Sequence, residues 1–211
     1  LKCYSLKNGS TIWSHNTEKP FISSSKKLSI AIKNNNVIFN NSIGDITSVN
    51  IKKGNLNWQM SSRNSQIFQD IMNLKSSNLI INNESIYFSN NKNEFYSLDL
   101  NSGLINWKQN INSNLKLTII DNLIFTITMN GYLFVIEKNS GNIIRITNIF
   151  KGIKQKIKNQ LLPTGFVLNN KNIFVSTNKG FLIVIDIKNG VINKKFNFDN
   201  NKISRPFAQN K

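Results

Sequence analysis

A glycine-centred hairpin recurs along this chain and constrains the fold more than any other feature. Its clearest copy spans residues 95–107, where Tyr96, Leu98 and Leu100 alternate with polar residues and an Asn-Ser-Gly sequence follows. Alternation with a period of two is typical of a half-buried strand, and Asn-Ser-Gly is a turn signal between two such runs. Gly103 adopts without steric cost the positive φ that closes a short hairpin loop. The sequence therefore predicts a strand, a tight turn and a second strand here.

Four further copies align on this glycine. The five glycines are Gly9, Gly54, Gly103, Gly141 and Gly190, and they are separated by 45, 49, 38 and 49 residues. A near-constant period of this length is expected for one blade of a β-propeller. Repeated helix pairs have a similar period, but their apolar residues would recur at spacings of three and four. The observed alternation favours strands.

The position four residues after the hairpin glycine is tryptophan in three copies and basic in the other two. Trp13, Trp58 and Trp107 each lie four residues after the glycine, and Arg145 and Lys194 occupy this position in the last two copies. Large rings that recur at the blade period are expected to pack between neighbouring blades rather than to stack on a cofactor, because aromatic burial is a major source of stability. The two copies without tryptophan are where we expect departures from regular packing.

Acidic residues precede two of the hairpin glycines. Asp99 and Asp186 each lie four residues before the glycine of their copy. A short carboxylate at the start of a turn hydrogen-bonds the backbone N–H groups that follow it. We expect both side chains to cap hairpin loops rather than to act in catalysis.

The repeats predict an all-β chain, a β-propeller of four-stranded antiparallel blades that forms a single partial domain over residues 1–211. Residues 1–18 are expected to be a partial blade, and residues 199–211 the start of a next one, with residues 203–207 as its first strand. Whole blades are predicted at residues 19–60, 61–110, 111–148 and 149–198. Since a closed propeller abolishes sheet edges, four blades and two remnants are expected to be about half of a larger ring.

The charge balance leaves several partner classes open. The chain carries 27 basic and 10 acidic residues, a net charge of +17, which is compatible with nucleic acid, anionic lipid or an acidic protein. The lysines are dispersed through every repeat, and Arg63, Arg145 and Arg205 are the only arginines. Specific readers of bases and phosphates favour the rigid fork of arginine, so dispersed lysine favours general solvation and no nucleic-acid partner.

Chemistry-bearing residues are scarce. Cys3 is the only cysteine and His15 the only histidine, which excludes an intrachain disulfide and a histidine-based triad or multi-histidine metal site within the chain. No phosphate-binding G-x-x-x-x-G-K loop is present. We therefore predict no catalytic residue, no metal ligand, no cofactor and no small-molecule substrate. His15 is interpreted as a surface residue and Cys3 as a strand-packing residue.

Two segments interrupt the repeat. Residues 66–74 carry apolar residues that fit one face of a short helix, either packed over a neighbouring blade or used as a partner-binding loop. Residues 151–158 form a basic stretch, interpreted as a solvated loop, and they are the best local candidate for an acidic or phosphate contact. No residue can be assigned to partner binding from the sequence.

The hairpin resembles the repeat named for pyrroloquinoline quinone (PQQ). In that repeat a small residue, an aspartate two later, threonine-glycine, and a tryptophan four after the glycine recur in each blade. Ser97, Asp99, Ser102, Gly103 and Trp107 match best. Ser5 and Asn50 replace the aspartate in the first two copies, and the later copies lack the tryptophan. The resemblance covers essentially the whole chain and specifies fold better than function.

Within this superfamily the chain is most similar to the BamB family of outer-membrane protein assembly factors. The resemblance implies a non-enzymatic, eight-bladed scaffold in the periplasm. It also implies attachment to the outer membrane by a lipid anchor outside this segment and binding to a subunit of the barrel-assembly machinery. The superfamily also contains PQQ-dependent dehydrogenases, whose calcium site and adjacent cysteine pair have no counterpart in this sequence. A propeller scaffold for another protein partner is the third alternative.

Overall fold

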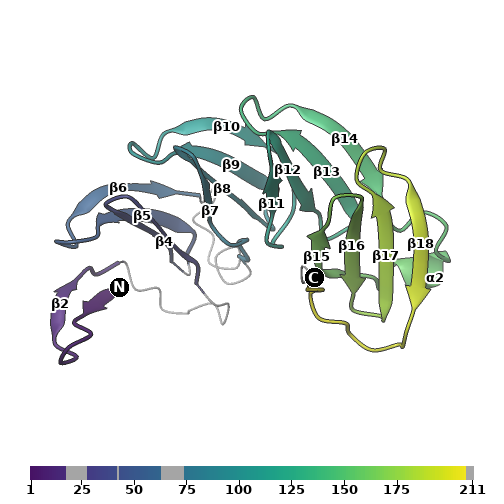
Figure 1. Cartoon of the computed structure of the whole chain (residues 1–211), viewed down its shortest axis with the longest axis horizontal. Coiled ribbons are helices and arrows are strands. Elements are labelled where there is room, and N and C mark those ends of the chain that lie inside the picture. Colours follow the sequence, from purple (N-terminus) through teal and green to yellow (C-terminus); the bar gives the residue numbers. More distant parts are fainter. Residues whose placement is uncertain (18–27, 42, 63–73, 208–211) are drawn as a thin grey trace. The chain divides into compact units, whose positions relative to one another are not determined.

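The computed structural model describes residues 1–17, 28–41, 43–62 and 74–207, and the regular secondary structure of these residues is almost entirely β-strand (Figure 1). The chain divides into two compact units, residues 1–111 and 112–211. Among the described residues, no helix is long and apolar enough to cross a lipid bilayer.

The first unit contains a hairpin and two four-stranded sheets. The hairpin pairs β1 (Lys2–Tyr4) with β2 (Thr11–Ser14). The first blade consists of β3 (Ile30–Lys33), β4 (Asn36–Asn40), β5 (Asp45–Asn50) and β6 (Leu56–Ser61). The second blade consists of β7 (Ile80–Asn82), β8 (Ser85–Asn90), β9 (Glu94–Asp99) and β10 (Ile105–Gln109).

The second unit contains two further sheets and a short helix. The third blade consists of β11 (Thr118–Ile120), β12 (Leu123–Ile127), β13 (Tyr132–Glu137) and β14 (Ile143–Asn148). The helix α2 (Gln155–Lys158) follows it. The fourth blade consists of β15 (Pro163–Leu168), β16 (Asn172–Thr177), β17 (Phe181–Asp186) and β18 (Ile192–Asn197).

Each four-stranded sheet is an antiparallel meander in which consecutive strands are neighbours (Figure 1). The last two strands of each blade shift register by one residue just after the hairpin glycine, as between Ile105 and Trp107. A bulge at this point fits a hairpin loop that ends in a left-handed residue. The predicted all-β fold of four-stranded antiparallel blades is confirmed. The closure of a larger ring stays a prediction.

Burial follows the position of a strand in its blade. In β5 and β9 five of six residues are buried, whereas β6 and β10 are exposed except around Trp58 and Trp107. A middle strand covered on both faces needs apolar or small side chains on both, which explains why Ile46 and Thr47 are equally buried. The alternation of apolar and polar residues in the sequence therefore identifies β5 and β9 as strands, but it does not show that one of their faces is exposed.

Residues 203–207 do not form the strand that their sequence predicts. They are held against the fourth blade by isolated contacts. The Ile203 N–H donates to the Thr177 carbonyl at 3.1 Å, and the Arg205 Nε donates to the Phe166 carbonyl at 3.1 Å. Pro206 has no N–H to donate to a ladder, and Arg205 uses its side chain rather than its backbone for the contact with β15.

The two interrupting segments have different outcomes. The predicted helix at residues 66–74 lies outside the described residues, except for Leu74, which is buried. The basic stretch at residues 151–158 contains α2, whose last turn carries Lys156 and Lys158 and which has no buried residue.

Candidate functional site

The five hairpin glycines share one conformation. Each has a φ between +71° and +76°, and each N–H donates to the carbonyl four residues earlier, as Gly103 does to Asp99 at 3.0 Å. Four of the five are buried, and Gly9 is exposed. The recurring glycine thus builds the loop at the same place in every copy.

The aspartates of the repeat hold these loops from inside. Asp99 Oδ1 accepts from the Asn101 N–H at 3.0 Å and from the N–H and hydroxyl of Ser102 at 2.8 Å each. These bonds stabilise the carboxylate and lower the pKa of Asp99. Asp186 accepts in the same way from the N–H groups of its own loop in the fourth blade, and Asn50 does so in the first blade with its amide oxygen. The side-chain oxygens of Asp99, Asp186 and Asn50 therefore serve as hydrogen-bond acceptors within their turns.

Two of the three tryptophans in the first unit, Trp13 and Trp58, dock on the glycine of the following copy. Trp58 lies so close to Gly103 that a Cβ there would be 2.5 Å from the ring, and its Nε1 donates to the Leu100 carbonyl at 3.0 Å. Trp13 covers Gly54 in the same way and donates to the Ile51 carbonyl at 2.9 Å. In both cases the acceptor lies three residues before the glycine. The third tryptophan, Trp107, lies edge-on to Phe95 at 5.4 Å.

Arg145 takes the tryptophan's place between the third and fourth blades. Its guanidinium donates to the Ile187 carbonyl at 2.8 Å and to the Lys188 carbonyl. Ile187 lies three residues before Gly190, which is the same position relative to the glycine as Ile51 and Leu100. Burial lowers the pKa of Arg145, partly opposed by the charge of Asp186. The charged group therefore reproduces the docking contact of an indole.

Substitution of Arg145 tests this equivalence. Arg145→Trp is expected to leave the free energy of unfolding within about 1 kcal/mol of the unmodified value, because an indole satisfies the same carbonyl in two other copies. Arg145→Ala is expected to cost about 2 kcal/mol, since it removes hydrogen bonds from a charged donor. Urea unfolding of the 211-residue chain measures both. A larger loss for tryptophan than for alanine would contradict the equivalence.

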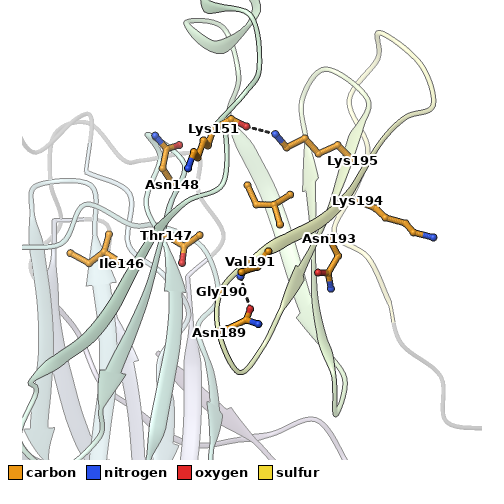
Figure 2. A pocket seen from close by; sticks show the side chains of 11 residues that line it. Ile146, Thr147, Asn148, Lys151, Asn189, Gly190, Val191, Asn193, Lys194 and Lys195 are labelled. Carbon is orange, nitrogen blue, oxygen red and sulfur yellow. Dashed lines mark hydrogen bonds between the residues drawn. The ribbon is translucent and has the colours of Figure 1, made fainter.

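A cleft lies beside Arg145, between the outer strand of the third blade and the outer hairpin of the fourth. It has a volume of about 690 Å³. Its lining residues are Ile146, Thr147, Asn148 and Lys151 on one side and residues 189–195 on the other (Figure 2). None of the lining residues that the structure describes is acidic. The cleft is the candidate site of this chain.

The lysines of the cleft differ in direction. Lys195 points across the cleft and donates to the Lys151 carbonyl, whereas Lys194 points away from it (Figure 2). Burial lowers the pKa of Lys195, because its ammonium group loses contact with water. Lys194, which holds the tryptophan position of its copy, is exposed. The repeat marks the location of the cleft, but Lys195 is not a residue that we singled out from the sequence.

The remaining candidate residues are Cys3 and His15, which lie in the first unit. Cys3 is a free thiol on β1, partly exposed. His15, predicted at the surface, is partly buried with its ring edge-on to Phe39 at 6.2 Å. In the part of the chain that the structure describes, no three His, Cys, Asp or Glu residues are grouped so as to hold a metal ion.

Comparison with solved structures places the fold among propellers. BamB from Moraxella catarrhalis aligns at 12% identity over 98% of this chain and 72% of its own, with a TM-score of 0.59. The computationally designed protein Ika8 aligns at 13% identity over 99% and 59%, with a TM-score of 0.72. The propeller domain of Cps50 (Swd1) from Myceliophteria thermophila aligns at 9% identity over 84% and 57%, with a TM-score of 0.64.

At these identities the likeness shows the fold alone, and the chain spans between 57% and 72% of the length of these three structures. No curated protein matches the sequence. The model of the family described as outer membrane protein assembly factor BamB matches residues 2–147, which is more than half of the chain. That match covers three of the hairpin copies with tryptophan and the copy with Arg145. The chain therefore belongs to the BamB family of PQQ-repeat propellers.

Proposed function

We propose that this chain is a non-enzymatic protein-binding scaffold that supports the insertion of outer-membrane β-barrel proteins. It would act in the periplasm, at the outer membrane, by binding a subunit of the barrel-assembly machinery. The observation that carries the proposal is the match of residues 2–147 to the BamB family model. The location at the outer membrane and the lipid anchor outside this segment are part of the same proposal.

The geometry of the repeat supports a scaffold. Its recurring glycines, aspartates and the docking residues Trp13, Trp58 and Arg145 are occupied in loops and between blades. Partner contacts then fall on positions that break the repeat, which are the inter-blade segments and the outer strand edges.

Co-purification tests the proposed partner. The tagged chain is expected to retain the central barrel-assembly subunit from detergent-solubilised outer membranes of its own organism. Replacing residues 66–74 and 151–158 with Gly-Ser linkers is expected to reduce the retained amount about tenfold, if these segments carry most of the contact energy. Failure of the unmodified chain to retain the subunit would refute the proposal. Unchanged retention by the doubly replaced chain would remove both segments as contacts.

A charge-matched control keeps the result specific. The linker at residues 151–158 removes four lysines, so the control replaces four exposed hairpin lysines with glutamine, namely Lys7, Lys52, Lys53 and Lys188. This control is expected to retain the subunit. Spectroscopic titration of the chain with PQQ and Ca²⁺ addresses the dehydrogenase alternative, and saturable binding of the quinone would favour that alternative over the scaffold.

A further inference from the structure

In both blades of the first unit, the residue five positions after the hairpin glycine donates a hydrogen bond to a buried carboxylate. In the second blade it is Lys108, whose ammonium forms an ion pair with Glu94 Oε1 at 3.0 Å. In the first blade it is Gln59, whose amide donates to Asp45 Oδ2 at 3.4 Å. Asp45 and Glu94 both begin the third strand of their blade and are both buried. The repeat thus pairs a donor on the outer strand with a buried carboxylate.

The fourth blade keeps the donor and loses the carboxylate. Lys195 lies five residues after Gly190, and Phe181 begins the third strand in place of the acid. The opposite effects on the two lysines follow from this difference. Burial acts to lower the pKa of both, but the hydrogen bonds and charges of Glu94 and Tyr96 together outweigh it and raise the pKa of Lys108, whereas the pKa of Lys195 is lowered. Lys195 is a partly buried cation at a position built for an ion pair.

The opposite wall of the cleft adds a second cation. Lys195 donates to the carbonyl of Lys151, and an ammonium group has three donors, so two remain. The Lys151 side chain lies on the same wall as Asn148 (Figure 2). In the described part of the chain, no carboxylate forms an ion pair with either lysine. An anion in the cleft would therefore meet the Lys195 ammonium, and the Lys151 side chain on the opposite wall supplies a second positive charge within the same lining.

The rest of the lining fits a peptide. Val191 and Ile192 supply apolar surface, and Asn148 and Asn193 supply amide groups. The strands that flank the cleft, β14 and β18, each end their sheet, so one row of backbone N–H and C=O groups on each faces outward. An extended segment pairs with such an edge by main-chain hydrogen bonds and places alternate side chains toward the sheet. The volume of about 690 Å³ is in the range of sites for ligands of a few residues.

Phosphate is a poorer fit because the loop of the hairpin, residues 188–191, has no backbone donors left for it. The N–H groups of Lys188 and Asn189 donate to Asp186 Oδ1, at 2.8 and 3.0 Å. The Gly190 N–H donates to the Asp186 carbonyl, and the Val191 N–H to Asn189 Oδ1. Sites for phosphate usually aim several free backbone N–H groups at the anion. A carboxylate needs fewer donors, and two lysines supply them.

We propose that the cleft between β14 and β18 binds an acidic side chain of an extended partner segment, with Lys195 and Lys151 as its cationic contacts. The proposal deepens the scaffold function and rests on it for the identity of the partner, but the cleft itself is defined by the residues above. Binding would restore to Lys195 the ion pair that Lys108 has in the second blade.

Titration with a defined probe tests the cleft. The probe is a fluorescein-labelled hexapeptide of alternating Glu and Val, and the reference peptide has Gln for Glu. The unmodified chain is expected to prefer the Glu peptide at about 100 mM salt, and Lys195→Gln is expected to weaken this binding about tenfold through loss of a charge-assisted hydrogen bond. Lys188→Gln removes the same charge from an exposed lysine of the same hairpin that does not line the cleft, and it is expected to change the affinity less than about twofold, since an exposed charge contributes little.

Each outcome decides the proposal. Equal weakening by Lys188→Gln and Lys195→Gln would show non-specific attraction by the net charge of +17 and overturn it. Loss of binding to phosphatidylglycerol vesicles in Lys195→Gln, with peptide binding unchanged, would assign the cleft to a phosphate and also overturn it. Peptide binding that depends on Lys195, in a chain that retains no barrel-assembly subunit, would keep the cleft and refute the proposed function.

Discussion

Replacing Gly103 with alanine is expected to lower the free energy of unfolding by about 3 kcal/mol. Two costs combine at this position. The φ of +72° lies in the left-handed region, and the new Cβ would lie 2.5 Å from two ring carbons of Trp58. The indole is 8% exposed and is held by its bond to the Leu100 carbonyl, so it cannot move away without breaking that contact. Urea unfolding of the 211-residue chain measures the loss.

Gly9 provides the matched control for this substitution. It has nearly the same φ, +71°, but a Cβ added there has no heavy atom within 4 Å. Gly9→Ala is therefore expected to cost only the backbone strain, about 1 kcal/mol. The difference between the two variants isolates the close approach of the tryptophan. Equal losses at Gly9 and Gly103 would contradict the docking role of the buried glycine.

The local part of this arrangement could be predicted from the sequence. The alternation in residues 95–107 and the Asn-Ser-Gly turn identify the strands and the left-handed glycine, because both depend on neighbouring residues only. The blade period follows from counting the same signal along the chain. The second purpose of the glycine could not be predicted, since Trp58 and Gly103 lie 45 residues apart and their contact depends on how the first two blades pack.

The candidate site was harder to predict, for a physical reason. The sequence marks Arg145 as a departure, and the structure shows that a guanidinium and an indole reach the same carbonyl because both present N–H donors at the end of a long side chain. The blade departs from the regular pattern not at Arg145 itself but in the neighbouring cleft, at Lys195. Recognising that lysine requires comparing it with Lys108 and noticing that Phe181 replaces a carboxylate on another strand. A single repeat contains no sign of this missing partner.

Replacing Trp58 with alanine is expected to cost about 4 kcal/mol, the largest effect of the substitutions considered. The ring is buried among residues of both blades of the first unit, including Ile46 and Leu100. Trp58→Phe should lose about 1 kcal/mol for the missing donor to the Leu100 carbonyl, plus a smaller packing term. Trp13 makes the same contact but is partly exposed, so Trp13→Ala is expected to cost about 2 kcal/mol. Equal losses at Trp13 and Trp58 would contradict the dependence on burial.

Combining Trp58→Ala with Gly103→Ala separates packing from backbone strain. Once the indole is gone, a Cβ on Gly103 no longer meets the ring carbons that lie 2.5 Å away in the unmodified chain. The second substitution should then cost about 1 kcal/mol rather than about 3, a coupling energy of about 2 kcal/mol between residues in contact. Because the strain at φ +72° remains in both backgrounds, it cancels from this difference. Additive losses would mean that the glycine is required by its loop alone, and that the tryptophan stabilises the blades without it.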